Sequence, residues 1–204
     1  MSKMTVEDTS LTAVADAIRT KGGTTDPLVF PDGFVDAIGN ISGGVNEAWK
    51  GIIEGKNNNI TADMLEGITE LRQYLFFFSS LESIVVPDGI KLNGGVFSNC
   101  KRLVSVVLPD SLTSIPGEMF NTDISLPSIV IPRNVKNIVG YSFNQCTSLT
   151  TVEMKPTTPP TLNNKAFNKC PNLSKFIVPK GTLDAYKTAT NWSAYADLMV
   201  EAEV

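Results

Sequence analysis

The feature of this chain that most constrains its fold is a motif repeated along most of its length. The motif is anchored by a leucine that returns every 22 to 24 residues, at Leu81, Leu103, Leu126, Leu149 and Leu173. An interval of this length is much longer than the period of a helix or a strand, and it is typical of a solenoid. Because one such unit is too small to bury its own apolar face, neighbouring units must stack to form a core.

The order of residue types within a unit predicts its geometry. In the copies at 97–109 and 167–179, a phenylalanine is followed by a cysteine after three residues, by the anchor leucine after six and by a proline after twelve. Between leucine and proline, Val106 and Leu108 lie two residues apart, which indicates a strand that buries them while Val107 faces outward. The proline ends the strand because it has no N–H group to donate.

The rest of each unit is expected to lead back to the start of the next. Leu112 and Ile115 lie three residues apart, and this spacing suits a short return segment that is either extended or 3₁₀-helical. The phenylalanine of each motif is predicted to fill the interior between layers. In the irregular first copy, Phe76 or Leu75 is expected in that role.

Segments at the two ends are expected to begin and close the solenoid. A short strand near Ile60 could begin it, and terminal repeats are usually atypical because they also cap the stack. From about residue 180, an aromatic-rich helical segment is predicted to cover the last layer with Leu183, Tyr186, Trp192, Tyr195 and Leu198. We expect residues 201–204 to be solvated.

The three cysteines do not suggest a disulfide framework. Cys146 and Cys170 occupy the same position of adjacent copies, so their Cβ atoms point the same way, which is a poor geometry for a disulfide. They are interpreted as buried free thiols; a metal site would lack both a CxxC pair and a histidine. Asp123 stands where a further cysteine belongs. It and Glu153 are predicted to be solvated, with an acidic pocket as the alternative.

Composition excludes several classes of function. The net charge is −4, the pI is near 4.9 and the 17 Lys and Arg residues are scattered, so no basic field for nucleic acid is expected. No run approaches the roughly 20 apolar residues of a membrane helix, and the first residues lack the apolar core of a secretory signal. The absence of histidine removes Ser-His-Asp and Cys-His sites. We expect no catalytic, cofactor or metal site.

These motifs carry a family resemblance. The repeated phenylalanine, cysteine, leucine and proline-ended strand are similar to the BspA-type leucine-rich repeats of bacterial surface and prophage proteins, and residues 178–196 resemble the cap that often closes them. The resemblance implies an α+β fold, with a solenoid of short strands and 3₁₀ segments in about five repeats at 45–204 and a helical cap from about 180. It also implies a binding or adhesive module rather than an enzyme.

Residues 1–44 are predicted to form a separate unit of two short helices. Ser10 is placed to cap a first helix that Gly22 stops, and Asp32 could cap a second. Such helices bury little between them, so they are expected either to fold back on the solenoid or to pack against copies of themselves. The stretch 11–34 resembles the amino-terminal module of tail-associated proteins of phages and prophages. This resemblance implies a role in attachment or oligomerisation.

The outward side of the predicted strands is the candidate contact surface. One of its two columns is mostly apolar, and the other mostly carries hydroxyl groups. The candidate residues of the surface are Val85, Ser105, Val107, Ser128, Val130, Thr151, Glu153, Lys175 and Ile177. One interpretation is that β-branched residues simply suit strands and are half exposed there. The other is a binding surface, because contiguous exposed apolar patches tend to mark contact sites.

Three functional hypotheses follow. The leading one is a non-enzymatic, phage or prophage tail-associated protein whose solenoid recognises a host-surface molecule, located in the virion or in the cytoplasm before assembly. The alternative is a bacterial cell-surface adhesion protein of the BspA-like type, and the third is an enzyme. The expected partner is a protein or a surface glycan, with a homo-oligomer through residues 1–44 as a further option. Neither nucleic-acid binding nor membrane insertion is expected.

Overall fold

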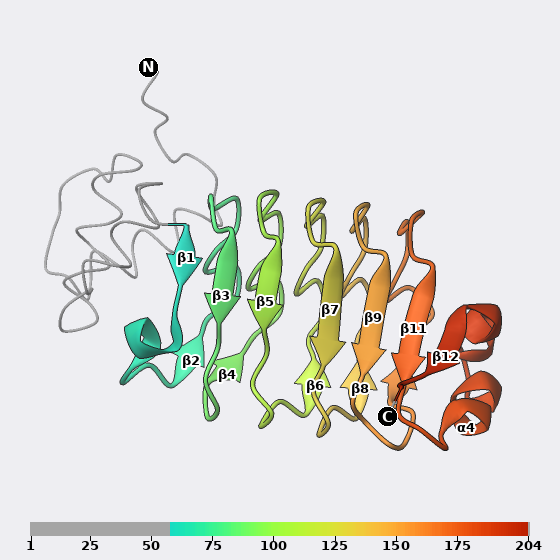
Figure 1. Cartoon of the computed structure of the whole chain (residues 1–204). Helices are drawn as coiled ribbons and strands as arrows, with labels where there is room; N and C mark the ends of the chain where they lie inside the picture. The colour runs from blue at the N-terminus through green and yellow to red at the C-terminus, as the bar shows by residue number, and fades with distance from the viewer. Residues whose placement is uncertain (1–57, 204) are drawn as a thin grey trace, which may run out of the picture. The chain divides into compact units, whose positions relative to one another are not determined.

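Successive repeats contribute strands to two parallel rows (Figure 1). The computed structural model describes residues 58–203. The main strand row consists of β1 (Asn59–Ile60), β3 (Ser83–Val85), β5 (Ser105–Val107), β7 (Ser128–Ile131), β9 (Thr151–Met154), β11 (Lys175–Val178) and β12 (Met199–Glu201). The return strand row consists of β2 (Glu70–Leu71), β4 (Lys91–Leu92), β6 (Ser114–Ile115), β8 (Asn137–Ile138) and β10 (Thr161–Leu162).

The chain divides into two compact units, Met1–Asn58 and Asn59–Val204. The solenoid and its cap belong to the second unit. The two helices predicted for residues 1–44 and the phage-like stretch at 11–34 lie outside the described residues.

The repeat period of the sequence determines which residues pair in neighbouring strands. Ile84 lies beside Val106, and Ile129 lies beside Val152, each one repeat further along the chain. The return segments are two-residue strands, so the 3₁₀ option for them was wrong. Hydrogen bonds between repeats, such as Lys136 N–H to Thr113 O at 2.8 Å, satisfy backbone groups that a 3₁₀ turn would satisfy internally. In the described part of the chain, the 3₁₀ helices η1 (Ala62–Leu65) and η2 (Ser193–Leu198) lie towards its two ends.

A stack of phenylalanine rings runs through the interior, as the sequence predicts. The rings are nearly parallel, and successive centroids lie 5.7, 5.5, 5.2 and 5.0 Å apart along Phe76, Phe97, Phe120, Phe143 and Phe167. Each such pair contributes about 0.5–1.5 kcal/mol beyond its burial. Phe76, rather than the half-buried Leu75, therefore fills the interior of the first copy. The anchor leucines are fully buried beside this stack, except for the half-buried Leu173.

Two polar ladders connect the repeats next to the phenylalanine stack. In one, a cysteine thiol donates to the carbonyl of the phenylalanine in the preceding repeat, as from Cys146 to Phe120 O at 3.0 Å. In the other, side-chain amides donate from each repeat to the one before, from Asn144 to Asn121 at 2.7 Å and from Asn168 to Asn144 at 2.6 Å. Both ladders satisfy buried or half-buried polar groups and fix the spacing of the layers.

The main strand row is interrupted between β5 and β7. It consists of the sheets β1-β3-β5 and β7-β9-β11-β12, and β5 does not pair with β7. At the residue after each anchor leucine, the backbone N–H normally donates to the previous repeat, as Thr150 does to Pro127 O at 2.9 Å. Pro127 occupies this position in its own repeat. Because proline has no N–H group, it cannot donate the equivalent hydrogen bond to the carbonyl oxygen of Val104. Beside the interruption, Val106 is half-buried rather than buried as predicted.

The C-terminal cap covers the last repeat with α4 (Leu183–Thr188), η2 and β12 (Figure 1). Trp192 and Tyr186 are fully buried, and each donates a hydrogen bond of 2.7 Å to a proline carbonyl, at Pro160 and Pro156. The predicted helical cap is therefore present, but it also contains a strand. Glu201 was expected in a solvated tail, yet it belongs to β12, which pairs in parallel with β11, although its side chain is exposed.

Candidate interaction surface

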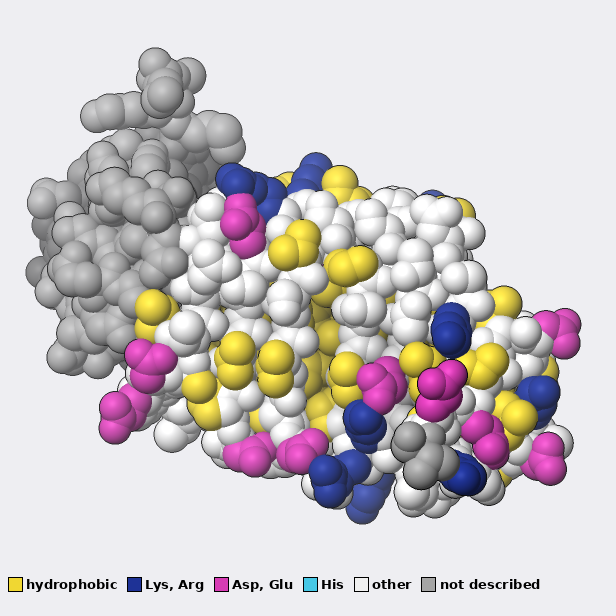
Figure 2. Space-filling view, viewed as in Figure 1, with side chains coloured by type: hydrophobic (Ala, Val, Ile, Leu, Met, Phe, Trp, Pro, Cys, Tyr) yellow, Lys and Arg dark blue, Asp and Glu magenta, His cyan; other side chains and the backbone are white. Residues whose placement is uncertain are grey.

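The outer face of the main strand row carries all the residues predicted for the contact surface. Val85, Val107 and Val130 are 38%, 51% and 43% exposed. Val85 lies beside Val107 in the paired strands β3 and β5, and Val130 follows on β7, across the interruption in the row. Figure 2 shows hydrophobic side chains following one another across this face. Because these valines are on short paired strands, their positions are fixed before any partner arrives.

The apolar column changes character towards the cap. Glu153 is half-buried beside Val130, and its carboxylate forms an ion pair with Lys155. Ile177 is half-buried, and Val200 of β12 lies beside it with 42% of its surface exposed. Sequence reasoning missed Val200, although the alternation of buried Met199 and exposed Val200 resembles that of the repeat strands. The column is therefore apolar on both sides of a single ion pair.

The second column of this face is polar. Ser105, Ser128 and Lys175 are exposed, and Thr151 is half-buried. Strand pairing places Thr151 between Ser128 and Lys175. At the start of the column, Ser83 Oγ donates to Asn59 Oδ1 at 2.5 Å. The face thus combines an apolar column with a column of hydroxyl groups that donate and accept hydrogen bonds.

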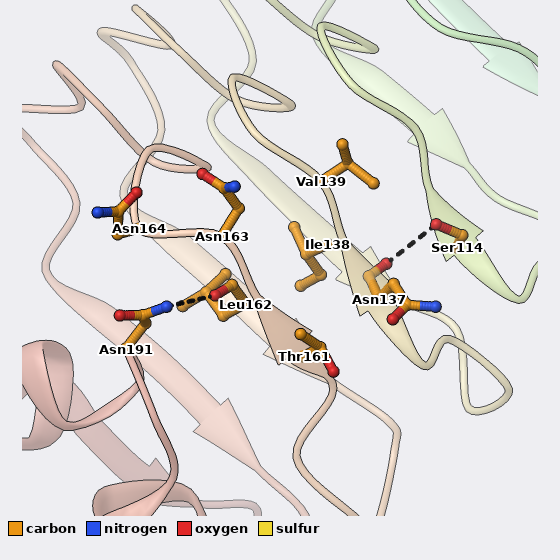
Figure 3. Close-up of a pocket in the computed structure, with 9 residues that line it drawn as sticks. All are labelled: Ser114, Asn137, Ile138, Val139, Thr161, Leu162, Asn163, Asn164 and Asn191. Carbon is orange, nitrogen blue, oxygen red and sulfur yellow. Dashed lines mark hydrogen bonds between the residues drawn. The ribbon is translucent and has the colours of Figure 1, made fainter.

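A second surface feature is a recess over the return strand row, which sequence reasoning missed. It has a volume of about 610 Å³ and is lined by Ser114, Asn137, Ile138, Val139, Thr161, Leu162, Asn163, Asn164 and Asn191. These residues, labelled in Figure 3, come from β6, β8 and the residue after it, β10 and the loop after it, and the cap. Its only sequence signal is the concentration of asparagine near the end of the solenoid.

The first copy of the motif carries exposed aromatic side chains. Phe77 and Phe78 follow the buried Phe76 and are 44% and 64% exposed, whereas the other copies have polar residues at these two positions. Tyr74 is 43% exposed and donates to Glu118 Oε2 at 3.0 Å. The first copy of the motif is thus atypical on its surface as well as in its sequence.

Asp123 is buried, so the prediction that it is solvated was wrong. Its side chain takes the cysteine position of the thiol ladder, where Oδ1 accepts the N–H of Cys100 at 2.9 Å. Within the described residues Oδ2 has no hydrogen-bond partner. Burial raises the pKa of this carboxyl well above its ordinary value, partly offset by the hydrogen bond from Cys100. The position is dictated by the repeat register, which places residue 123 in the core whatever its type.

The cysteines are free thiols, as predicted, but they differ in environment. Cys100 and Cys146 are buried, and Cys170 is half-buried. Burial raises the pKa of Cys100 strongly, with a further rise from nearby Asp123. A hydrogen bond between Cys146 and Cys170 raises the pKa of Cys146 and lowers that of Cys170. Because its pKa is lowered and its side chain is half-buried, we expect Cys170 to be the most reactive of the three.

The described residues show no arrangement suited to metal binding. Within 58–203, no group of three or more His, Cys, Asp or Glu side chains could hold a metal ion. No helix in this part of the chain is long and apolar enough to cross a membrane. The recess and the strand face instead offer hydroxyl, amide and apolar groups, which are the components of recognition surfaces.

Stacked repeats with a strand, a return segment and a capped end define a leucine-rich-repeat solenoid, a class that is typically non-enzymatic and binds proteins on extended surfaces. The model of the BspA type leucine rich repeat region matches six copies over residues 58–193, and the chain belongs to this family. Six copies are one more than the five anchor leucines suggest. Strand β1, which pairs in register with β3, shows that the stack begins upstream of Leu81.

Solved structures share this fold. A leucine-rich repeat protein from Bacteroides ovatus is 25% identical, with 72% of this chain and 43% of that one covered and a TM-score of 0.54. The pneumococcal vaccine antigen PcpA is 19% identical, with 72% and 42% covered and a TM-score of 0.55. A leucine rich cell surface protein from Faecalibacterium prausnitzii is 22% identical, with 73% and 34% covered and a TM-score of 0.46. This chain thus spans less than half of each of these proteins. No curated protein matches it.

Proposed function

We propose that the solenoid is a non-enzymatic recognition module of a bacterial cell-surface adhesion protein, and that it binds a protein partner through the outer face of the main strand row. The observation that carries this proposal is the column of exposed valines at Val85, Val107 and Val130. Membership of the BspA-type family supports it, and solenoids commonly bind through such extended faces.

The energetics of the valine column favour a protein partner. Covering a half-exposed valine contributes about 1 kcal/mol, so the three together supply about 3 kcal/mol to an interface. The neighbouring serine and threonine hydroxyls provide the polar contacts that orient such an interface. An apolar centre with a polar rim is the usual composition of a protein–protein contact.

The proposal is tested by adhesion of beads that carry the full chain to an epithelial cell monolayer. The double variant Val107→Lys/Val130→Lys removes about 2 kcal/mol of apolar contact, which corresponds to a loss of about 30-fold in affinity. Treating the monolayer with protease should abolish adhesion of the unmodified chain. Ile124→Lys is the matched control, because Ile124 is 38% exposed but lies outside both the main strand row and the recess.

Two outcomes contradict the proposal. One is adhesion that the double variant retains in full while its thermal unfolding is unchanged. The other is the absence of protease-sensitive adhesion by the unmodified chain. The control variant must bind as the unmodified chain does, since a general effect of surface lysines would otherwise explain the loss.

The tail-associated hypothesis depends on different residues. The resemblance that suggests it lies at 11–34, whereas the family match covers 58–193. The surface-protein alternative is therefore the better supported of the two. Light scattering on the full chain and on a form without residues 1–44 separates the two hypotheses. A trimer that is lost on truncation favours the tail-associated hypothesis, with attachment through residues 1–44. A monomer in both forms counts against that hypothesis.

A further inference from the structure

The recess over the return strand row has a chemical composition distinct from that of the main strand face. None of its nine lining residues is charged, and six of them carry amide or hydroxyl groups. The main face, by contrast, contains the ion pair between Glu153 and Lys155 together with Lys175. A neutral site with both donors and acceptors suits a neutral polar ligand, because a charged ligand would lose hydration without gaining a partner.

Two asparagines of the recess are held so that they present opposite polarities. Asn163 Oδ1 accepts the backbone N–H of Lys165 at 3.0 Å, which leaves the Nδ2 group of Asn163 as a donor. Asn191 Nδ2 donates to Leu162 O at 2.7 Å, which leaves the Oδ1 atom of Asn191 as an acceptor (Figure 3). A hydroxyl group both donates and accepts, so neighbouring hydroxyls on one ligand match this pair.

Packing between repeats fixes the position of Asn163. A Cβ atom at Gly140 would lie 3.1 Å from Asn163 Oδ1 and 3.2 Å from its Cγ, so the side chain lies directly against the glycine backbone. Asn164 takes the position held by Gly94, Gly117 and Gly140 in earlier repeats, where each glycine approaches the next turn closely. The last repeat is followed by the cap and not by another repeat. Its residue at this position, Asn164, therefore has room for a side chain, and this amide is exposed.

The recess also offers an apolar surface. Val139 is 43% exposed and neighbours Asn163, because the preceding residues Ile138 and Leu162 are register partners. The recess, of about 610 Å³, is open to solvent rather than enclosed, so it suits a ligand that is contacted on one side only. A sugar ring combines a C–H face with a rim of hydroxyl groups, and it is neutral.

We propose that this recess binds a short segment of neutral glycan, with its C–H face on Val139 and its hydroxyl groups on Asn163 and Asn191. The site is separate from the valine column, so it does not depend on the protein-binding proposal. A chain with both sites would engage a glycosylated surface through its protein and its sugar at once.

The test is titration of the full ¹⁵N-labelled chain with neutral trisaccharides: maltotriose, cellotriose, mannotriose and the trimer of N-acetylglucosamine. At least one is expected to shift the side-chain amide signals of Asn163 and Asn191. Asn163→Asp keeps the side-chain shape but replaces the ligand-facing donor Nδ2 by a negative oxygen, and Asn191→Gly removes the ligand-facing acceptor Oδ1 at a position where φ is 65°. Each should weaken binding by about tenfold, because a recognition site that loses a matched polar partner typically loses about 1–3 kcal/mol.

The controls separate binding at the recess from other effects. Asn172→Asp makes the same chemical change at an exposed position outside the recess and should leave affinity unchanged. Val107→Lys/Val130→Lys should also leave it unchanged, whereas Val139→Lys should lower it. The proposal is overturned if no trisaccharide binds at about 10 mM, a concentration that would detect even millimolar affinity. It is equally overturned if Asn163→Asp and Asn191→Gly bind as the unmodified chain does.

Discussion

Replacing Asp123 by cysteine should stabilise the solenoid at neutral pH. In the other copies of the ladder, the thiols of Cys100, Cys146 and Cys170 donate to the carbonyl of the phenylalanine in the preceding repeat at 3.0, 3.0 and 2.9 Å. Asp123 makes one hydrogen bond through Oδ1, and its Oδ2 has no partner among the described residues. The substitution removes this buried acceptor and places a thiol where the repeat directs it towards Phe97 O.

The expected gain in the free energy of unfolding is about 1–3 kcal/mol at pH 7, the usual cost of a buried polar group without a partner. For a unit of this size, each kcal/mol raises the melting temperature by about 2–4 °C. The N–H of Cys100 keeps an acceptor after the substitution, because it also lies 3.1 Å from Phe97 O. Asp123→Asn is the matched control, since it keeps the oxygen that accepts from Cys100 but has no titrating group.

The pH dependence distinguishes the buried carboxyl from a simple packing effect. Burial raises the pKa of Asp123 in the folded state, so the folded protein binds this proton more tightly than the unfolded chain. Its destabilising effect is absent below the unfolded pKa of about 3.9 and grows as the pH rises towards the folded pKa. The advantage of Asp123→Cys over the unmodified chain should therefore increase from pH 4 upwards.

Urea unfolding with a reducing agent, at several pH values between about 4 and 7.5, measures this advantage. The upper limit keeps the new thiol protonated. Asp123→Asn should show a pH dependence like that of Asp123→Cys, because neither has the carboxyl. The reasoning is refuted if Asp123→Cys is no more stable than the unmodified chain at pH 7. It is also refuted if the difference between them does not change with pH.

Two further predictions concern Pro127 and Cys170. Pro127→Thr restores the N–H that should reach Val104 O, so its amide should exchange with solvent about as slowly as that of Thr150; fast exchange would contradict this explanation of the interruption. The free energy of unfolding of Pro127→Thr should differ from that of the unmodified chain by less than about 1 kcal/mol. The new hydrogen bond stabilises the folded state, but replacing proline gives the unfolded chain more freedom, and the two effects offset each other. Iodoacetamide should modify Cys170 about tenfold faster than Cys100 in the folded protein. Equal rates by mass spectrometry would contradict the assigned environments.

The sequence predicts the repeated part of this fold well, because each repeat residue is specified several times. Residues one leucine interval apart are partners in neighbouring strands, and phenylalanines one interval apart stack on each other. The two columns of the main strand face follow from the same register, so their residues could be named in advance. Their role as a contact surface stays a prediction, because exposure alone does not distinguish a half-exposed strand residue from a binding residue.

The features that sequence reasoning missed arise where one repeat departs from the others. Asp123 was predicted to be solvated because of its residue type, yet its register placed it in the core. Pro127 interrupts a ladder of hydrogen bonds that is visible only when neighbouring repeats are superimposed. The recess is lined both by Asn191 of the cap and by Asn163 of the last repeat, and no periodic pattern relates these two residues.

The departures from the repeat are therefore the best guide to what distinguishes this solenoid from others of its family. Stacking of the repeats explains a residue that fits the repeat pattern. A residue that departs from the pattern and lowers the stability of the fold requires another explanation. Asn163 and Asn164 break no hydrogen-bond ladder and lie on the surface, so they cost the fold little and are available for recognition. Asp123 lies in the core, where its cost falls on stability alone. This contrast directs binding experiments to the capped end of the solenoid and to the valine column, and stability experiments to its centre.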